Sequence, residues 1–372
     1  MASRGNCFAA ALRGRKRARA SGFAQIHDLE SEVTARKVRI GLIGCGGIMG
    51  AHISNYRAIK QAEIAALADV KRAQMAATVA KHPELDRLPQ FPDYRRMIEK
   101  VELDGVVIAT PHSLHFEQIT TCLKAGLHVL VEKPMVCTVA HANQVIKAAD
   151  KQGKVVMIAY QRHFSRAWRL VKKMMEQGKL GKLTFVSALQ AQDWLRWTKG
   201  GWRHNPKLSC GGQLNDAGSH LIDALLWATG LQPDTVFAQI NNRGTNVDIL
   251  SGVTVRFRGG AIGTMSVVGD APGWWEDIAF YGEKGGLYAR RDYLRMPDDQ
   301  LFQTSRGKSL FSADLKELTV KSKYSSNADK NFVDSILGKD EPQTPAIWGL
   351  RVMQLTEAAW TSARTGAPVK VK

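Results

Sequence analysis

The segment from Val38 to Gly50 constrains the fold of this chain more than any other. An apolar stretch from Val38 to Ile43 runs directly into a glycine-rich turn, Gly44-Cys45-Gly46-Gly47-Ile48-Met49-Gly50. Gly44 can adopt a tight turn, and Gly46 has no Cβ, so phosphate oxygens can approach the backbone amides at the start of the following helix. A strand, a glycine turn and a helix in this order are typical of a pyrophosphate-binding turn in a dinucleotide-binding domain.

A second apolar stretch supports this interpretation. Residues Ile64 to Ala68 end in Asp69, close to the separation at which an acidic side chain meets the adenosine ribose hydroxyls. Asp69 favours NAD over NADP, because a carboxylate repels a 2′-phosphate, although Lys71 and Arg72 follow closely and could offset that repulsion. Met49 occupies the third glycine position, which puts the closest helix–strand packing in question. The residues expected to bind the cofactor here are Gly44, Gly46, Gly47, Ile48, Met49 and Asp69.

Length and composition narrow the class of protein. With 372 residues the chain is long enough for two domains, and no apolar run is long enough to cross a bilayer. The five cysteines include no Cys-x-x-Cys pair, which argues against a zinc ribbon and against a disulfide framework. A reducing compartment fits this pattern, so we expect a cytoplasmic protein without a membrane partner.

The net charge of +18 is concentrated in part between Arg13 and Arg19. We expect residues 1–36 to form a disordered basic arm. A solvated tail and an upstream start codon are the simpler explanations, while nucleic-acid contact or an organelle-targeting peptide are the alternatives. No apolar segment follows the basic run, so export is not expected; mitochondrial import stays open because the arm is rich in arginine and lacks acids before Asp28.

The rest of the chain divides into three parts with different sequence patterns. Residues 37–160 alternate short apolar runs with amphipathic stretches, which predicts a doubly wound parallel α/β sheet. Residues 161–345 contain strand-like runs joined by short glycine turns, which predicts an α+β domain built on an open, mainly antiparallel sheet. Residues 346–372 form a C-terminal helix and tail, the helix from Trp348 to about Arg364 ending at Gly366.

Two segments follow predicted parallel strands and should lie at the ligand crevice. Thr110 and Pro111 come directly after the strand that ends at Ala109, and His115 follows them. His115 is either a contact for the nicotinamide half of the cofactor or a histidine at a helix start without a ligand. Glu132 and Lys133 come directly after the next strand, and Pro134 fixes the backbone behind them, so the Lys133 ammonium is expected to point into the site.

A third segment carries Asp216 and His220, four residues apart. If a helix has begun by Asp216, both side chains share one face, and the carboxylate can orient the imidazole or share a substrate hydroxyl with it. A metal site would need His204 or Asp223 as further ligands, and we expect none. Trp202 and Arg203 lie near this segment in the sequence and are expected to line the substrate site.

The glycine turn, Asp69, Thr110-Pro111, Glu132-Lys133-Pro134, Trp202-Arg203 and the Asp216 and His220 pair occur in an order that resembles the Gfo/Idh/MocA oxidoreductase family. The resemblance spans roughly Val38 to the C-terminus. It implies a nicotinamide dinucleotide, sugars or cyclitols as substrates, and Lys133, Asp216 and His220 as the catalytic set. It also implies a homo-oligomer, a dimer or tetramer, formed through the C-terminal sheet.

These observations predict oxidation of a secondary alcohol in a sugar, glycoside or cyclitol. His220 would act as the base, Lys133 would stabilise alkoxide character or relay a proton, and Asp216 would orient the substrate and His220. Two alternatives remain: a glycosidase that uses tightly held NAD for transient oxidation, and a non-catalytic cofactor-sensing protein. Only the sensor would use the basic arm to bind nucleic acid, and a sensor would not need Lys133, Asp216 and His220. Nucleic acid is therefore not an expected partner.

Overall fold

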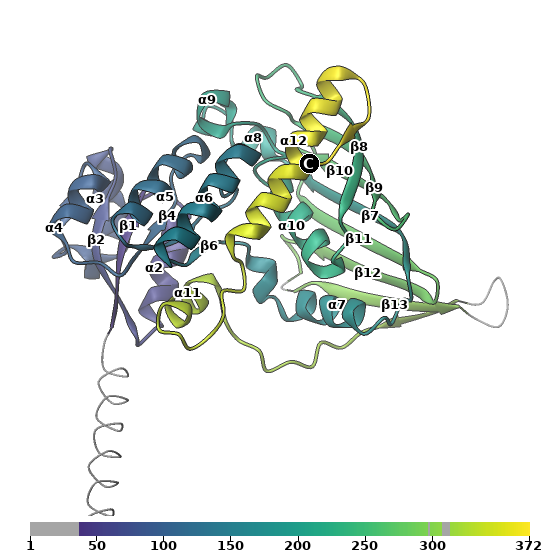
Figure 1. Ribbon diagram of the computed structural model, residues 1–372, viewed down its shortest axis with the longest axis horizontal. Coiled ribbons are helices and arrows are strands. Elements are labelled where there is room, and N and C mark those ends of the chain that lie inside the picture. Colours follow the sequence, from purple (N-terminus) through teal and green to yellow (C-terminus); the bar gives the residue numbers. More distant parts are fainter. Residues whose placement is uncertain (1–36, 297, 307–312) are drawn as a thin grey trace, which may run out of the picture.

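Six parallel strands form the first sheet, in the order β3-β2-β1-β4-β5-β6 (Figure 1). The computed structural model describes residues 37–296, 298–306 and 313–372, so the basic arm expected over residues 1–36 lies outside the described residues. The strand order is that of a doubly wound dinucleotide-binding sheet, which confirms the predicted fold of this domain. The strands are β1 (Val38–Ile43), β2 (Ala62–Ala68), β3 (Gln90–Phe91), β4 (Gly105–Ile108), β5 (His128–Val131) and β6 (Val156–Ile158). The helices between them are α2 (Met49–Arg57), α3 (Arg72–Lys81), α4 (Tyr94–Lys100), α5 (His115–Lys124) and α6 (Val139–Gln152).

The second sheet is mixed and mainly antiparallel, as predicted. Its order is β14-β13-β12-β11-β7-β10-β9-β8-β15, and only β7 and β10 pair in parallel. The strands are β7 (Leu183–Gln192), β8 (Pro233–Asn241), β9 (Leu250–Phe257), β10 (Ile262–Val268), β11 (Trp274–Gly282), β12 (Gly285–Asp292), β13 (Gln300–Arg306), β14 (Ala313–Glu317) and β15 (Val369–Lys370).

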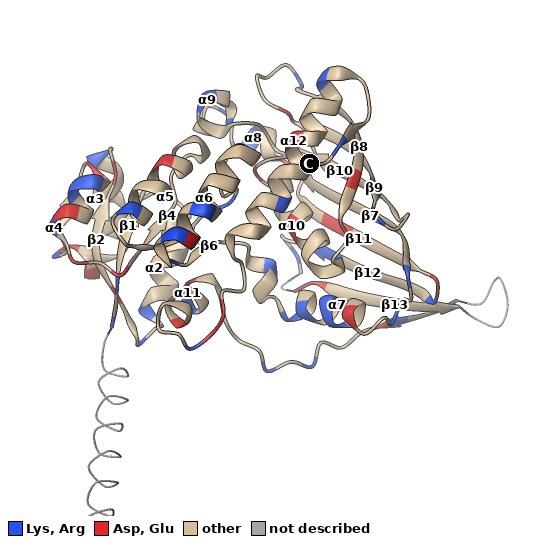
Figure 2. Ribbon diagram, in the orientation of Figure 1, with Lys and Arg blue, Asp and Glu red and all other residues tan. Residues whose placement is uncertain are grey.

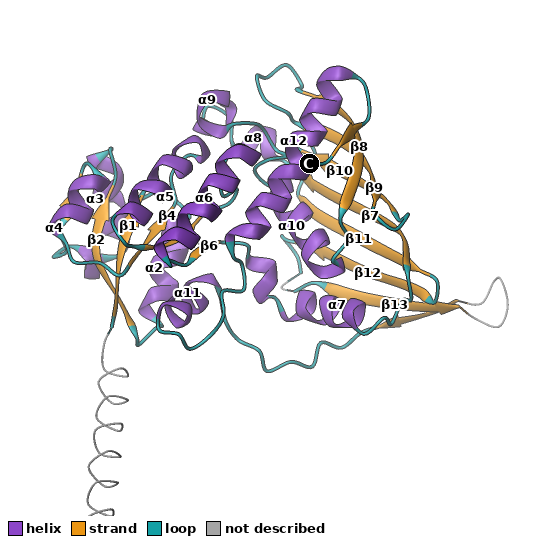
Figure 3. Cartoon of the chain, viewed as in Figure 1, coloured by secondary structure: helices purple, strands orange, loops and turns teal. Residues whose placement is uncertain are grey.

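Helices cover one face of this second sheet (Figure 3). They are α7 (Arg166–Glu176), α10 (Gly218–Thr229) and α12 (Ala346–Thr365). Along β9, Val253, Val255 and Phe257 are buried while the residues between them are exposed. The period-two alternation therefore separates an inner face that packs on helices from an outer face that is left open.

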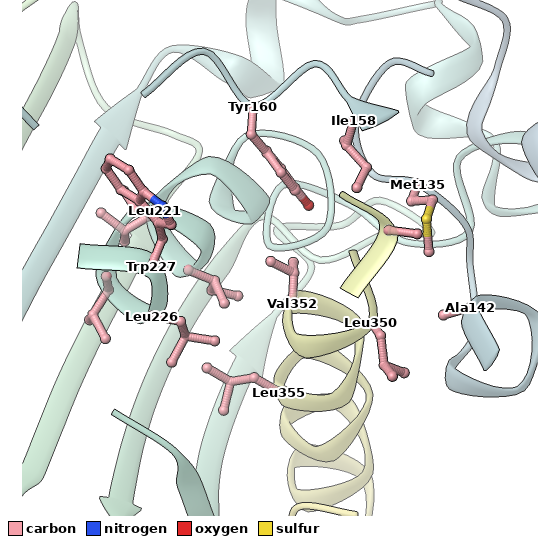
Figure 4. Close-up of a cluster of buried hydrophobic side chains, with 14 of the residues drawn as sticks. Met135, Ala142, Ile158, Tyr160, Leu221, Leu226, Trp227, Leu350, Val352 and Leu355 are labelled. Carbon is pink, nitrogen blue, oxygen red and sulfur yellow. The ribbon is translucent and has the colours of Figure 1, made fainter. Parts of the chain in front are cut away.

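Helix α12 joins the two domains. It packs against α6 of the first domain and against α10 and β8 of the second. Figure 4 shows Val352 and Leu355 of α12 near Leu226 of α10, with Ile158 and Tyr160 above them at the end of β6. The helix ends at Gly366, whose φ of +67° is left-handed, as the predicted glycine cap requires. One apolar core thus extends from the first sheet through α12 to the second.

Helix α11 (Ala328–Ile336) returns from the second sheet to the first domain and is fixed there by buried charges. His52 of α2 lies between Asp329 of α11, at 2.7 Å, and Glu132 after β5, at 3.3 Å. Although burial opposes protonation, Asp329 and Glu132 raise the pKa of His52 to about 10. A charged histidine therefore holds three segments that are remote in sequence.

One expectation is wrong: the chain contains a disulfide. Cys137, in the loop after β5, is bonded to Cys210 at the end of the short helix α9 (Pro206–Ser209), with 5.7 Å between the Cα atoms. The two residues are 73 positions apart, and only the folding of the second domain against the first brings them together. Motif spacing therefore could not reveal the pair, and the inference of a reducing compartment loses this support. Among the described residues, no helix is long and apolar enough to cross a membrane.

We expect denatured, non-reduced protein to show two fewer reactive thiols than the same protein after reduction. The Cys137→Ser variant should abolish this difference and lower the free energy of unfolding by about 2–4 kcal/mol, because the crosslink restricts the unfolded chain. Thiol titration and chemical denaturation measure the two effects. Equal thiol counts before and after reduction would show that the bond does not form.

Candidate active site

The glycine turn shows why glycine is needed at its first position. Gly44 has φ +88°, and a Cβ there would lie 2.7 Å from the carbonyl oxygen of Ala109. Above Gly46 and Gly47 the space is open, with no atom within 4 Å of an added Cβ. Helix α2 begins at Met49, whose side chain is fully buried and fills the space between helix and sheet. Met49, at the third glycine position, therefore packs into the core. The turn keeps an open backbone surface at a helix N-terminus.

Asp69 lies at the end of β2, beside this turn. Its carboxylate accepts hydrogen bonds from the backbone N–H of Cys45, at 2.8 Å, and of Lys71, at 2.8 Å. The side chain is partly exposed, so its negative charge borders the open side of the turn. This is the position that the sequence predicted for the adenosine ribose.

Thr110 and Pro111 directly follow β4 and are half-buried. His115 does not face the crevice. It is fully buried, and its two ring nitrogens lie 2.9 Å from the carbonyl oxygens of Thr110 and Pro134. Burial lowers the pKa of His115. The geometry therefore assigns His115 to holding the loops after β4 and β5 together, and it does not favour the expected contact with nicotinamide.

Lys133 points across the domain junction. The Lys133–Pro134 peptide bond is cis, and the Lys133 ammonium donates to Asp216 Oδ1 at 2.6 Å and to the Asp216 carbonyl oxygen at 3.2 Å. Glu132, beside it, accepts from the Lys133 backbone N–H at 3.2 Å and faces His52. A cavity of about 300 Å³ is lined by Ile48 of the glycine turn and by Glu132. The glycine turn and the segment after β5 therefore share one cavity.

Asp216 contacts several side chains of the candidate site. Its other carboxylate oxygen accepts from Arg203 Nε at 2.7 Å and from Trp194 Nε1 at 2.8 Å. Although burial opposes ionisation, Lys133 and Arg203 hold the pKa of Asp216 well below its usual value. Asp216 therefore stays ionised and fixes the Lys133 ammonium.

His220 differs from its expected relation to Asp216. Helix α10 begins at Gly218, so Asp216 precedes the helix and the two residues do not share a helix face; the carboxylate is held by Lys133, Arg203 and Trp194 instead. His220 is partly exposed and lies edge-on to Tyr160, with 6.0 Å between ring centroids. Burial, the Lys133 ammonium and the Arg162 guanidinium lower the pKa of His220 well below its usual value. His220 is therefore a neutral imidazole that can accept a proton.

The loop before α10 is shaped by Asp248, which the sequence did not single out. Asp248 accepts from the backbone N–H of Gly212 at 2.8 Å and of Leu214 at 2.7 Å. A Cβ on Gly212 would lie 1.9 Å from the Asp248 carbonyl oxygen, so this close approach requires glycine. The Gly211-Gly212 pair was the only local signal of this arrangement.

His112 is a further residue that sequence reasoning left without a role. It is buried, with Nδ1 at 3.0 Å from the Ser209 carbonyl oxygen and Nε2 at 3.6 Å from Asp216 Oδ1. Burial lowers its pKa to about 3, so it is neutral. Trp202 lies edge-on to His112, with 4.7 Å between centroids, which brings the predicted substrate residues Trp202 and Arg203 to Asp216.

The candidate metal ligands lie apart. His204 contacts the Thr198 hydroxyl at 2.8 Å, and Asp223 pairs with the buried His163 at 3.0 Å. Within the described ranges, no group of three or more His, Cys, Asp or Glu side chains could hold a metal ion.

Comparisons with known proteins agree with this geometry. Residues 38–160 match the family model of the oxidoreductase family with an NAD-binding Rossmann fold, and residues 168–288 match the GFO/IDH/MocA C-terminal domain. D-glucoside 3-dehydrogenase of Escherichia coli (strain K12) is 24% identical over 92% of this chain and 100% of its own length. Myo-inositol 2-dehydrogenase of Thermotoga maritima is 25% identical over 90% of this chain and 99% of its own.

A solved structure has a similar overall fold. The WlbA dehydrogenase of Bordetella pertussis, in complex with NADH and UDP-GlcNAcA, superposes with a TM-score of 0.76 at 25% identity, over 91% of this chain and 99% of that one. The matches to both domains, taken with the Lys133–Asp216 pair between them, show that this chain belongs to the Gfo/Idh/MocA family of NAD(P)-dependent oxidoreductases.

Proposed function

We propose that this enzyme oxidises a secondary alcohol of a sugar, glycoside or cyclitol. The observation that carries the proposal is the 2.6 Å contact between Lys133 Nζ and Asp216 Oδ1, which stands at the domain junction beside neutral His220. A fixed ammonium and a neutral imidazole are what removal of a hydroxyl proton requires. The sugar and cyclitol dehydrogenases that the chain resembles support the choice of substrate class.

The residues around the glycine turn fit a nicotinamide dinucleotide. Gly44, Gly46, Gly47 and Ile48 would hold the pyrophosphate at the start of α2, and Asp69 would meet the adenosine ribose. Thr110 and Pro111, which follow β4, and Glu132, which lines the cavity beside Ile48, would contact the nicotinamide half. We prefer NAD to NADP, because the Asp69 carboxylate would repel a 2′-phosphate.

Each catalytic residue has a distinct task. His220 would accept the hydroxyl proton, and Lys133 would stabilise the negative charge that develops on the oxygen. Asp216 would hold the ammonium in place, while Arg203 and Trp202 would contact the substrate from the adjoining segment. The bound nicotinamide ring supplies the hydride acceptor.

The first test is a screen of cyclitols, aldoses and glycosides with NAD and with NADP, read by absorbance of the reduced cofactor. We expect turnover with at least one of these compounds and a higher kcat/KM with NAD. Lys133→Ala and His220→Gln should each lower kcat/KM by about 10²–10⁴-fold, because each removes a charge-stabilising or proton-accepting group.

Lys147→Ala is the matched control, since Lys147 is exposed on α6 of the same domain. It should keep full activity and the wild-type melting temperature. His220→Gln should keep the melting temperature and NAD binding, whereas Lys133→Ala should melt at a lower temperature, because it leaves the buried Asp216 carboxylate without its ammonium partner. Glycoside cleavage without net cofactor reduction would indicate the glycosidase instead. Cofactor binding without turnover of any compound would favour the sensor.

The pH dependence tests the role of His220. The base must be neutral, and the lowered pKa of His220 keeps it neutral far below pH 6.5. We expect kcat/KM for alcohol oxidation to stay level as the pH falls through 6.5, and to decrease only in more acidic buffer. An acid limb centred near 6.5 would assign the proton to a different, unperturbed histidine.

The outer face of the second sheet fits a second copy of this chain. Phe185 and Tyr281 lie opposite one another on this face, and Ile262 and Phe237 are 44% and 38% exposed. Four apolar side chains on one open sheet face favour a self-complementary interface, so we propose a dimer or tetramer formed through it.

Light scattering after gel filtration should give twice or four times the chain mass. Ile262→Glu should shift the protein toward monomer, because it places paired charges in the interface. Val70→Glu, which alters a residue 84% exposed in the first domain, should leave the mass unchanged. A wild-type monomer would contradict the proposed interface.

A further inference from the structure

On the inner face of the second sheet, the side chains change from apolar to polar at paired positions of three neighbouring strands, β7, β11 and β12. These paired polar positions form the polar level of the sheet. On β7, Val186 and Ala188 are followed by Gln190 and Gln192. On β11, the partners of Gln190 and Gln192 are Glu276 and Trp274, and on β12 the partner of Glu276 is Arg291. These positions would otherwise belong to the core, and burying polar groups there is costly. A set of polar residues aligned in this way indicates a site.

Arg162 adds a charge to this polar level. It follows β6, is buried, and pairs with Glu276, and the same guanidinium nitrogen donates to the Tyr293 hydroxyl oxygen at 2.9 Å. Gln190 Nε2 donates to Glu276 Oε1 at 2.7 Å. Within the described residues, Arg162 Nε and Nη1 and Trp274 Nε1 are buried donors that have no partner. Unsatisfied buried donors of this kind are rare and call for a hydrogen-bonding ligand.

A cavity of about 280 Å³ lies against these residues. Arg162, Trp274, Arg291, Tyr293 and Asp299 line it. Gln161 and Ser165 line both this cavity and the neighbouring one that contains Ile48 and Glu132, so the two spaces adjoin. Lys133, Asp216 and His220 are not among the residues that line the 280 Å³ cavity. Gln161 in its wall follows Tyr160, whose ring lies edge-on to His220 with 6.0 Å between the ring centroids. The cavity is therefore adjacent to the group proposed to react.

The charges in the wall favour a neutral ligand with many hydroxyls. Arg162 is balanced by Glu276, and Arg291 lies 3.8 Å from Asp299. Two guanidinium groups and two carboxyl groups supply donors and acceptors without a net charge, and Trp274 and Tyr293 add aromatic surface. Carboxyl, guanidinium and aromatic groups together are suited to a sugar ring, whose hydroxyls both donate and accept.

We propose that this cavity binds a second sugar ring, joined to the ring that is oxidised at Lys133 and His220. The preferred substrate is then a glycoside of two rings, which specifies the substrate class within the proposed function and rests on it. Arg291 is a specificity-determining residue that contacts the second ring and takes no part in the chemistry.

The experiment compares matched pairs of one-ring and two-ring compounds: glucose with maltose, cellobiose and trehalose, galactose with lactose, and myo-inositol with its galactoside. For the productive pair, wild-type kcat/KM should be at least about 10-fold higher with two rings, the gain expected from one or two hydrogen bonds to charged groups. Arg291→Met should remove this advantage through KM, and change kcat/KM for the single ring by less than about 2-fold.

Arg290→Met is the matched control. Arg290 is the preceding residue of β12, pairs with Asp277 and faces the outer side of the sheet. It should leave both values unchanged. Equal use of one-ring and two-ring compounds by the wild type, or an equal loss for both in Arg291→Met, would overturn the second-ring site.

Calorimetric titration of NADH-loaded protein with the same pairs separates this proposal from the proposed reaction. Tighter binding of a two-ring compound, weakened by Arg291→Met but not by Arg290→Met, supports the cavity as a sugar site even where no oxidation is observed. Absence of two-ring binding at concentrations where the single ring binds, or absence of binding by every compound, overturns it.

Discussion

The buried ion pair between Lys133 and Asp216 is the interaction on which the site depends. It joins the loop after β5 of the first domain to the segment before α10 of the second, and both side chains are largely buried. Burying two charges is costly unless their mutual attraction and further hydrogen bonds compensate. Asp216 receives those additional bonds from Arg203 and Trp194, so all four side chains must be in place together. The position of the Lys133 ammonium therefore depends on how the two domains pack against each other.

Several contacts around this pair fix the same two loops. His115 joins the loops after β4 and β5, and His112 binds the carbonyl of Ser209, next to the bridged Cys210. Asp248 holds the backbone of Gly212 and Leu214 from the other side. Such redundancy holds the Lys133 ammonium within a narrow range of positions, as charge stabilisation in the proposed reaction would require. Lys and Arg residues are spread over helices of both domains (Figure 2), so the excess positive charge is not confined to this site.

The features predicted correctly are those encoded in short stretches of chain. The strand from Val38 to Ile43, its glycine turn and the glycine cap at Gly366 depend on local conformation, and each lies where the sequence placed it. The errors concern contacts between remote segments or the position of a boundary. The Cys137–Cys210 bond and the His52–Asp329 pair, which spans 277 residues, have no local signature. Helix α10 begins at Gly218, two residues after Asp216, so the condition for a helix face shared with His220 is not met, and Asp216 pairs with Lys133.

The polar level of the second sheet shows why substrate specificity is harder to derive than catalytic chemistry. Alternation along β7, β11 or β12 assigns each residue to a face, but a strand pattern of period two does not contain the register between strands. Gln190, Glu276 and Arg291 form one layer only because β11 lies between β7 and β12 in that register. The residues proposed to react, Lys133, Asp216 and His220, occur in short sequence motifs, so they can be recognised in the chain itself. The groups that select the substrate are assembled across strands, and they become visible only once the sheet is formed.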